Sequence, residues 1–201
     1  MKYYKESIFP TDVFIFDNIL EVEYIDSMRN DVILSSKQNS RENWQSESNI
    51  HTFPKYKALS KKIVECSKVV FNDKKYEYDT FEITDMWSNI LRSGEFHRPH
   101  THSNNILSGV YYVESDEVAN IRFYDPRPQA NVLTPKIKEF DKTNSSLWYF
   151  PSKTNRLILF PSWLQHYVPI NDSDKLRISI AFNIMFRGLV GDPKELQSAN
   201  F

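Results

Sequence analysis

The chain has 201 residues, of which 40% are hydrophobic and 14% aromatic, enough to bury one substantial core. Its 25 basic and 26 acidic side chains nearly cancel and form no block of like charge, so nothing indicates a nucleic-acid or membrane surface. Only four glycines occur, none in a glycine-rich loop, which excludes the usual phosphate-binding motifs. Because neither a signal-peptide pattern nor a membrane-spanning apolar run is present, we expect a cytoplasmic protein.

The N-terminal part, about residues 1–78, is predicted to be helical. Asn18 can cap a helix because Glu21 follows three residues later, and apolar residues then recur at helical spacing. After a polar loop, Pro54 is expected to open a second amphipathic helix that runs to about Phe71. We therefore expect two helices before any sheet.

The polar segment ENWQSESNIH, which contains Trp44 and His51, lies just before the β-rich part of the chain. Two interpretations stay open. The segment is either a lid that flanks the mouth of a binding site or an ordinary surface loop. His51 is given no role.

From Asp79 onward the hydrophobic period changes to two, with short aromatic and β-branched runs between Asn, Asp, Pro and Ser clusters. This pattern predicts about seven or eight strands over residues 79–187, in a sandwich or a barrel. No linker or repeat divides the sequence, so we expect a single domain over residues 1–201. Residues 188–201 are expected to form a tail, either a short helix or a loose end.

The last predicted strand has two different faces. One face is entirely apolar, and the other carries Arg177, Ser179 and Asn183. An arginine that faces a barrel interior needs an anionic partner, and the sequence offers no obvious carboxylate beside Arg177. A carboxylate of a ligand would serve. The alternative is an arginine exposed at the rim of the barrel.

Three of the five histidines lie within HRPHTHSN, residues 97–104. On a strand, His100 and His102 project from the same face and can reach one ion. His97 would then lie on the opposite face, before Pro99 in a loop, and is interpreted as a bystander. His166 follows a strongly apolar strand farther along the chain. A histidine pair and one distant histidine together indicate a metal site.

The order of these motifs resembles that of the iron(II)/2-oxoglutarate dioxygenases. Those enzymes carry His-x-Asp/Glu on one strand, a distal histidine later, and an arginine shortly beyond it; here HTH, QHYV and RIS stand in those places. More specifically, WQS, HTHSNNILSGVYYVE, FYDP, LILFPSWLQHYV and RISIAFN resemble a prolyl-hydroxylase-like group of predicted 2-oxoglutarate/iron oxygenases from marine bacteria and their phages.

This resemblance implies a mostly β fold, a double-stranded β-helix (jelly roll, cupin-like) with the N-terminal α-helices packed on one sheet. It implies Fe(II) as the metal, 2-oxoglutarate as co-substrate and O2 as oxidant. The implied reaction couples decarboxylation of 2-oxoglutarate to succinate with oxidation, usually hydroxylation, of a prime substrate. The residues implied for the metal are His100, His102 and His166. Those considered for the co-substrate are Arg177, Ser179, Tyr112, Asn89 and Asn183.

One position departs from the family pattern, because His102 stands where those enzymes carry a carboxylate. Three neutral imidazoles can hold iron(II), but they leave the site one charge unit more positive than two histidines and a carboxylate would. The alternatives are that water completes the site or that Asp125 reaches it. The Asp-Pro pair at Asp125 is interpreted more simply as a turn.

Two other functions stay open. One is a cupin-like dioxygenase with three histidines that needs no 2-oxoglutarate, and the other is a non-catalytic metal-binding module. The prime substrate depends on loops at residues 39–53 and 126–146, whose shapes the sequence does not give. A second copy of the chain is a further candidate partner.

Overall fold

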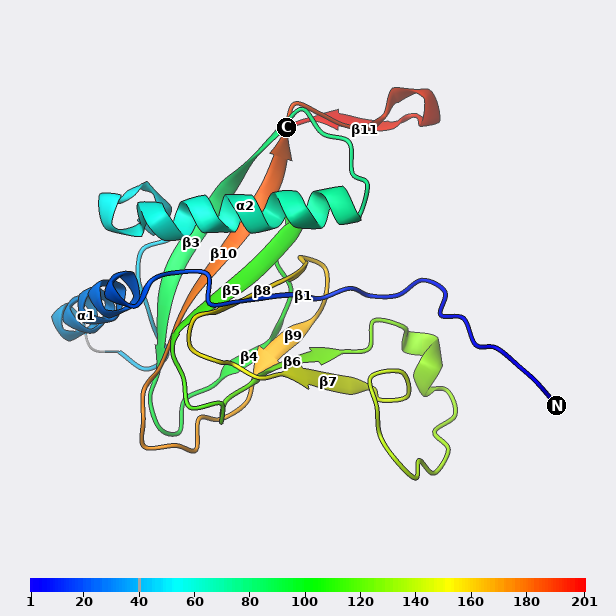
Figure 1. The fold of residues 1–201 in the computed structure, drawn as a ribbon, viewed down its shortest axis with the longest axis horizontal. Helices are drawn as coiled ribbons and strands as arrows, with labels where there is room; N and C mark the ends of the chain where they lie inside the picture. Colours follow the sequence, from blue (N-terminus) through cyan, green and yellow to red (C-terminus); the bar gives the residue numbers. More distant parts are fainter. Residues whose placement is uncertain (40) are drawn as a thin grey trace.

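Two antiparallel sheets face each other in the computed structural model, which describes residues 1–39 and 41–201 (Figure 1). The six-stranded sheet has the order β1 (Phe14–Asp17), β8 (Arg156–Pro161), β5 (Leu107–Glu114), β10 (Arg177–Arg187), β3 (Thr80–Leu91) and β2 (Trp44–Gln45). The four-stranded sheet has the order β4 (His97–His100), β9 (His166–Val168), β6 (Ile121–Tyr124) and β7 (Leu147–Phe150). This is the mostly β, double-stranded β-helix architecture expected, and its eight strands between β3 and β10 agree with the predicted number.

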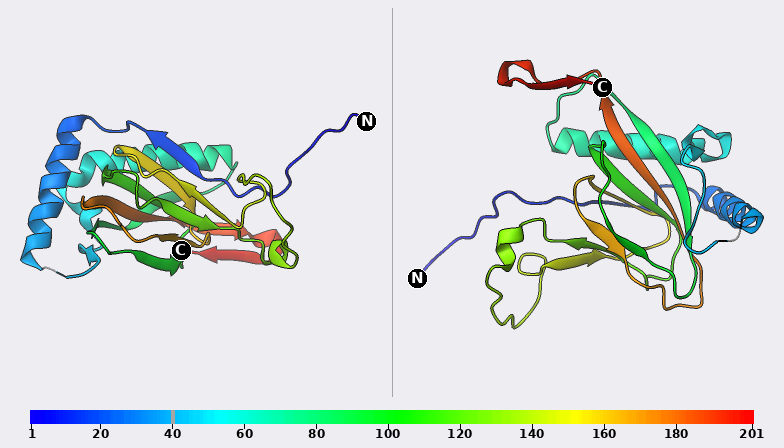
Figure 2. Two further views of the ribbon diagram at one scale, coloured as in Figure 1. Left: turned by 90° about the horizontal axis from the view of Figure 1, so that it is seen from below. Right: turned by 180° about the vertical axis from the view of Figure 1, so that it is seen from behind.

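Two helices cover one face of the six-stranded sheet (Figure 2). They are α1 (Val22–Gln38) and α2 (Lys57–Asp73), and α2 lies across the strands of that sheet (Figure 1). Short 3-10 turns occur at η1 (Ile50–Thr52), η2 (Pro54–Tyr56), η3 (Pro128–Asn131) and η4 (Pro193–Glu195). The expected packing of N-terminal helices on one sheet is confirmed.

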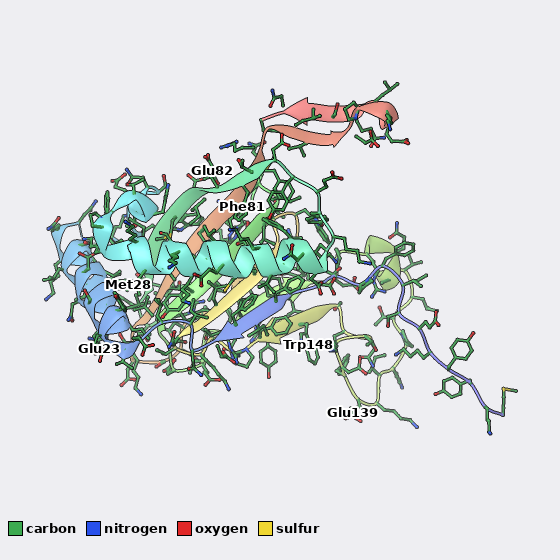
Figure 3. The ribbon with its side chains drawn as sticks, turned by 45° about the horizontal axis from the view of Figure 1, so that its top comes forward. Glu23, Met28, Phe81, Glu82, Glu139 and Trp148 are labelled. Carbon is green, nitrogen blue, oxygen red and sulfur yellow. The ribbon has the colours of Figure 1, made fainter. Side chains whose placement is uncertain are left out.

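Alternate residues of β10 face two different layers, the helices on one side and the four-stranded sheet on the other. Ile178, Ile180, Phe182 and Ile184 are fully buried in the core shared with both helices. At the end of the same core, the ring of Phe71 in α2 packs 5.0 Å from that of Phe81 in β3, centroid to centroid. Figure 3 shows Phe81 beside α2. Alternate residues of β10 point toward the four-stranded sheet, where they meet a second, smaller core and the cavity described below.

The N-terminal part differs from the prediction in two respects. Asn18 does not cap α1: it adopts φ 55°, and the helix begins at Val22 after Glu21, without a side-chain cap. The reason is that β1 continues to Asp17 and the chain must turn sharply before the helix. Both β1 and β2 join the six-stranded sheet, so the residues before 79 are not purely helical.

The C-terminal prediction of a short helix or loose end is wrong. β11 (Leu189–Asp192) and β12 (Gln197–Asn200) form an antiparallel hairpin. Gly188 at its base has φ 90°, a conformation in which a Cβ atom would clash with Asp79. Ser40, within the predicted polar loop, lies outside the described residues. Within residues 1–39 and 41–201, none of the helices has the length and apolar character needed to cross a membrane.

Candidate metal centre

Three histidines from two chain segments converge between the sheets. One ring nitrogen from each of His100, His102 and His166 lies within 4.8 Å of the other two. His100 ends β4 and pairs directly with His166, which begins β9. His102 lies beyond the end of β4, where its backbone N–H donates to the carbonyl oxygen of Ser162 at 2.9 Å. The structure therefore brings the three predicted metal ligands together.

Backbone hydrogen bonds orient two of these rings. Nδ1 of His100 lies 2.7 Å from the carbonyl oxygen of Arg98, and Nδ1 of His166 lies 2.9 Å from that of Leu164. A carbonyl only accepts, so each Nδ1 carries the proton and each Nε2 keeps a free lone pair. This is the support that metal-binding histidines usually have, and it leaves the nitrogens suited to a divalent ion.

Burial keeps His102 and His166 neutral at physiological pH. It lowers the pKa of His166 to about 3, against the opposing hydrogen bond to Leu164. It lowers the pKa of His102 to about 4, where His100 adds to the effect and Asp85 opposes it. Neutral imidazoles are the form that binds a metal, so little protonation competes with an ion near pH 7. The chemistry of the donor set therefore fits iron(II).

His97 does not lie where the sequence predicted. It belongs to β4 and lines the same cavity as the triad, because the strand register is irregular between His97 and His100. The prediction of a loop residue on the opposite face is wrong. Pro99 lies inside this short strand and cannot donate to the ladder, a usual mark of a bulge, so the sequence did contain a signal for the irregularity.

A cavity of about 500 Å³ extends from the triad toward Arg177. Arg177 is 2% exposed, so the alternative of a rim arginine is wrong. Its Nε donates to the carbonyl oxygen of Ala119 at 2.9 Å, and its Nη1 donates to Oγ of Ser179 at 3.2 Å. No carboxylate among the described residues pairs with this guanidinium, whose pKa is lowered by burial. The cavity thus ends in a buried cation without a counter-ion.

One row of side chains crosses three strands beside Arg177. Ser179 pairs with Asn89 of β3 on one side and with Tyr112 of β5 on the other. The ring centroid of Tyr112 lies 5.0 Å from Cζ of Arg177, and its hydroxyl is buried without a hydrogen-bond partner among the described residues. Because the hydroxyl, Ser179 and Arg177 can all donate, this end of the cavity suits an acceptor-rich group such as a carboxylate.

The side of the cavity formed by β3 and β2 carries a chain of hydrogen bonds that the sequence did not reveal. The indole Nε1 of Trp87 donates to Oδ1 of Asn89 at 3.2 Å, and Nε2 of Gln45 donates to the same oxygen at 2.9 Å. An indole N–H can only donate, so it fixes the orientation of the Asn89 amide and leaves the Asn89 amino group for the cavity. Asn43 and Gln45 also line the cavity, so this segment flanks the site.

Two further predicted residues lie elsewhere. Oδ1 of Asn183 accepts a hydrogen bond from Ser108 at 2.9 Å in a buried network, and Asn183 does not line the cavity. Asp125 pairs with Arg127, with Nη2 of Arg127 2.8 Å from Oδ2, and also accepts from the backbone N–H of Arg127. The interpretation of Asp125 as a turn residue is confirmed, and it is not part of the histidine group.

The sequence comparison gives one family match. Residues 85–183 match the family model described as "Putative 2OG-Fe(II) oxygenase", where 2OG denotes 2-oxoglutarate. This part of the chain is similar to that family. The match begins in β3 and ends in β10, and it therefore contains the triad and Arg177. No curated protein matches the chain.

Solved structures of oxygenases share the fold. A Pseudomonas putida prolyl-4-hydroxylase is similar over 89% of this chain and 94% of that chain, with a TM-score of 0.64 and 11% identity. A viral collagen prolyl hydroxylase from Paramecium Bursaria Chlorella virus-1, in complex with 2OG, is similar over 86% of this chain and 94% of its own, with a TM-score of 0.57 and 13% identity.

A third neighbour is HygX from Streptomyces hygroscopicus. Its structure with nickel and 2-oxoglutarate bound is similar over 95% of this chain and 91% of that chain, with a TM-score of 0.64 and 10% identity. HygX has also been solved with iron bound. The metal and co-substrate expected from the sequence agree with the family and with these neighbours. The expected origin in marine bacteria or phages stays a prediction.

Proposed function

We propose that the cavity is the active site of an Fe(II)- and 2-oxoglutarate-dependent hydroxylase. One observation carries the proposal: the histidine triad and a buried arginine without a counter-ion line the same cavity. The triad would hold the metal at one end. Arg177 would pair through its fork with the distal carboxylate of 2-oxoglutarate at the other end.

Three residues would complete the co-substrate site. The Ser179 hydroxyl, whose oxygen already accepts from Arg177, would donate to the same carboxylate. The buried hydroxyl of Tyr112, which has no hydrogen-bond partner among the described residues, would donate to that carboxylate as well. The oriented amino group of Asn89 would donate to the co-substrate from the other side of Ser179. Asn183 is left out, because its amide oxygen is satisfied away from the cavity.

The chain's contribution to the reaction is to bind, orient and exclude water. Bound iron(II) would supply the oxygen activation and electron transfer. Per turnover, O2, 2-oxoglutarate and a substrate C–H would give succinate, CO2 and a C–OH, with one atom of O2 entering succinate and the other entering the new hydroxyl. Trp87, whose ring centroid lies 5.9 Å from that of His102, would help to shield the metal side of the cavity.

The decisive experiment measures two quantities on the purified protein. Succinate is quantified after incubation with 2-oxoglutarate, O2 and Fe(II), with and without a chelator, and binding of 2-oxoglutarate is measured by calorimetry with Mn(II) in place of iron. We expect metal-dependent binding and slow metal-dependent succinate formation even without the prime substrate. Metal binding without 2-oxoglutarate binding would instead support the three-histidine dioxygenase or the metal-binding module.

The prime substrate is not assigned. HygX has been solved with nickel, 2-oxoglutarate and hygromycin B bound, so that neighbour holds a further organic ligand in addition to the metal and 2-oxoglutarate. We retain a single domain over residues 1–201 as part of the proposal. A cytoplasmic location and a homodimer stay predictions of the sequence.

A further inference from the structure

The second buried polar atom without a partner near Arg177 belongs to His97. Its ring lines the cavity, and its Nε2 is shielded from solvent without a hydrogen-bond partner among the described residues. A buried polar group left unpaired costs free energy, so such an atom in a native fold needs an explanation. His97 is not a member of the metal-binding group, and coordination of the ion therefore does not supply one.

The surroundings of His97 offer donors but few acceptors. Arg177 has guanidinium N–H groups beyond the two that bind Ala119 and Ser179, and the hydroxyl of Tyr112 is also unpartnered. One acceptor-rich group can satisfy all of these donors, because a carboxylate offers about four lone-pair positions. The orphan atoms of His97 and Tyr112, together with Arg177, thus describe a cradle for one carboxylate.

We propose that His97 is a co-substrate-binding residue whose Nε2–H donates to the distal carboxylate of 2-oxoglutarate. The inference rests on the proposed function and deepens it. It also accounts for the irregular register of β4, since regular alternation from His100 would turn His97 away from the cavity. The bulge around Pro99 lets one four-residue strand supply both a metal ligand and a co-substrate ligand.

The position of His97 favours the distal carboxylate over the metal-bound end. Burial lowers the pKa of His97 to about 4, and the nearby Arg177 cation contributes more to this lowering than His100 does. The ring is therefore neutral near pH 7, with one N–H to donate. A neutral donor beside Arg177 adds a hydrogen bond to the bound carboxylate without adding a second buried cation.

The test compares two ligands that differ only at the distal end. 2-Oxoglutarate and 2-oxopentanoate have the same chain length, but 2-oxopentanoate carries a methyl group in place of the distal carboxylate. Both are titrated by calorimetry into Mn(II)-loaded parent and His97→Leu. We expect His97→Leu to bind 2-oxoglutarate at least about tenfold more weakly, because a hydrogen bond to a charged group is lost. Binding of 2-oxopentanoate should be unchanged.

A matched pair of variants distinguishes the hydrogen bond from packing. The amide nitrogen of Gln in His97→Gln can occupy the position of Nε2, whereas that of Asn in His97→Asn cannot reach it. We expect His97→Gln to retain most of the affinity for 2-oxoglutarate and His97→Asn to lose it. His51→Leu, a histidine change outside the cavity, and the Mn(II) affinity of every variant serve as controls.

Three outcomes would overturn the inference. Parent-like 2-oxoglutarate affinity in His97→Leu would remove His97 from the site while leaving the proposed function intact. Equal losses for both ligands would place the effect of His97 at the metal-bound end. Failure of the parent itself to bind 2-oxoglutarate would overturn the proposed function, and this inference with it.

Discussion

The two sheets contribute different halves of the candidate site. The four-stranded sheet and the residues just after β4 supply the three histidines of the metal group. The six-stranded sheet supplies Arg177, Ser179, Tyr112 and Asn89, the residues proposed for the co-substrate. His97, on the four-stranded sheet, is the proposed exception. Because each half has its own sheet, metal binding and co-substrate binding should be separable by mutation.

The environments of the sheets explain this division. β5 and β8 of the six-stranded sheet are buried almost throughout, between the helices and the cavity. In β6 of the four-stranded sheet, buried and partly exposed residues alternate, as expected for a sheet with one solvent face. An unpaired arginine can be held only where the surrounding packing is extensive, whereas backbone carbonyls suffice to orient His100 and His166.

The largest expected effect is loss of the metal. We predict that His166→Ala and His100→Ala each reduce Mn(II) affinity by at least about a hundredfold, because these are the two ligands whose rings are held by backbone carbonyls. The fold should be retained, and Mn(II) titration with circular dichroism as a fold control measures both. His51→Ala is the matched control. Parent-like Mn(II) affinity in either variant would break the assignment of the metal to the four-stranded sheet.

The second prediction compares two buried arginines of the six-stranded sheet. Nε and Nη2 of Arg156 donate to the two carboxylate oxygens of Asp17, at 2.6 and 2.8 Å. Arg177 has no such carboxylate partner among the described residues. Arg177→Met should weaken 2-oxoglutarate binding by about 2–5 kcal/mol, well over tenfold, because a desolvated charge pair is lost. It should leave Mn(II) affinity and the unfolding midpoint close to those of the parent.

Arg156→Met should show the opposite behaviour. It should lower the free energy of unfolding by about 1–2 kcal/mol, a modest amount because the Asp17 side chain is 48% exposed, and leave ligand affinity unchanged. Calorimetry and urea unfolding on both variants measure the contrast. If Arg156→Met lost 2-oxoglutarate affinity as Arg177→Met does, the co-substrate site would not be specific to Arg177.

Acid should lower the free energy of unfolding of the metal-free protein, because buried histidines near the four-stranded sheet resist protonation. The folded-state pKa values of His97 and His102 lie at about 4 and that of His166 at about 3, below the ordinary value of 6.5. The unfolded state therefore binds more protons below pH 6.5, and stability is lost as the pH falls from there toward 4. We expect about 1–2 kcal/mol of loss between pH 7 and 6 by urea unfolding. Hydrogen exchange that accelerates first in the six-stranded sheet would contradict this account.

The smallest expected effect concerns His102. His102→Ala should weaken Mn(II) binding by about tenfold, or 1.4 kcal/mol, since this ligand lies beyond the strand end and, among the described residues, no backbone carbonyl orients its ring as it does those of His100 and His166. His102→Asp should retain binding, because Asp restores the carboxylate of the family pattern. Competition with a fluorescent chelator measures both affinities. If His102→Ala bound Mn(II) as tightly as the parent, water would complete the site.

Local patterns in the sequence determined much of this protein. The helical period predicted α2, the period of two predicted the strands of the β-helix, and the alternation of β10 separated Arg177 and Ser179 from the core. The histidine spacing predicted the metal group. These features depend on residues a few positions apart, whose side chains share a face wherever the segment is helical or extended.

Other features were decided only by the tertiary structure. The bulge that turns His97 inward depends on pairing with β9, and the satisfaction of Asn183 depends on Ser108 of another strand. The N-terminal residues Phe14–Asp17 became a strand because β8 offered a free edge. In each case the outcome is set by a partner far away in the chain. A local pattern gives the direction of a side chain, but only the assembled sheets determine which groups meet it and which remain unpaired.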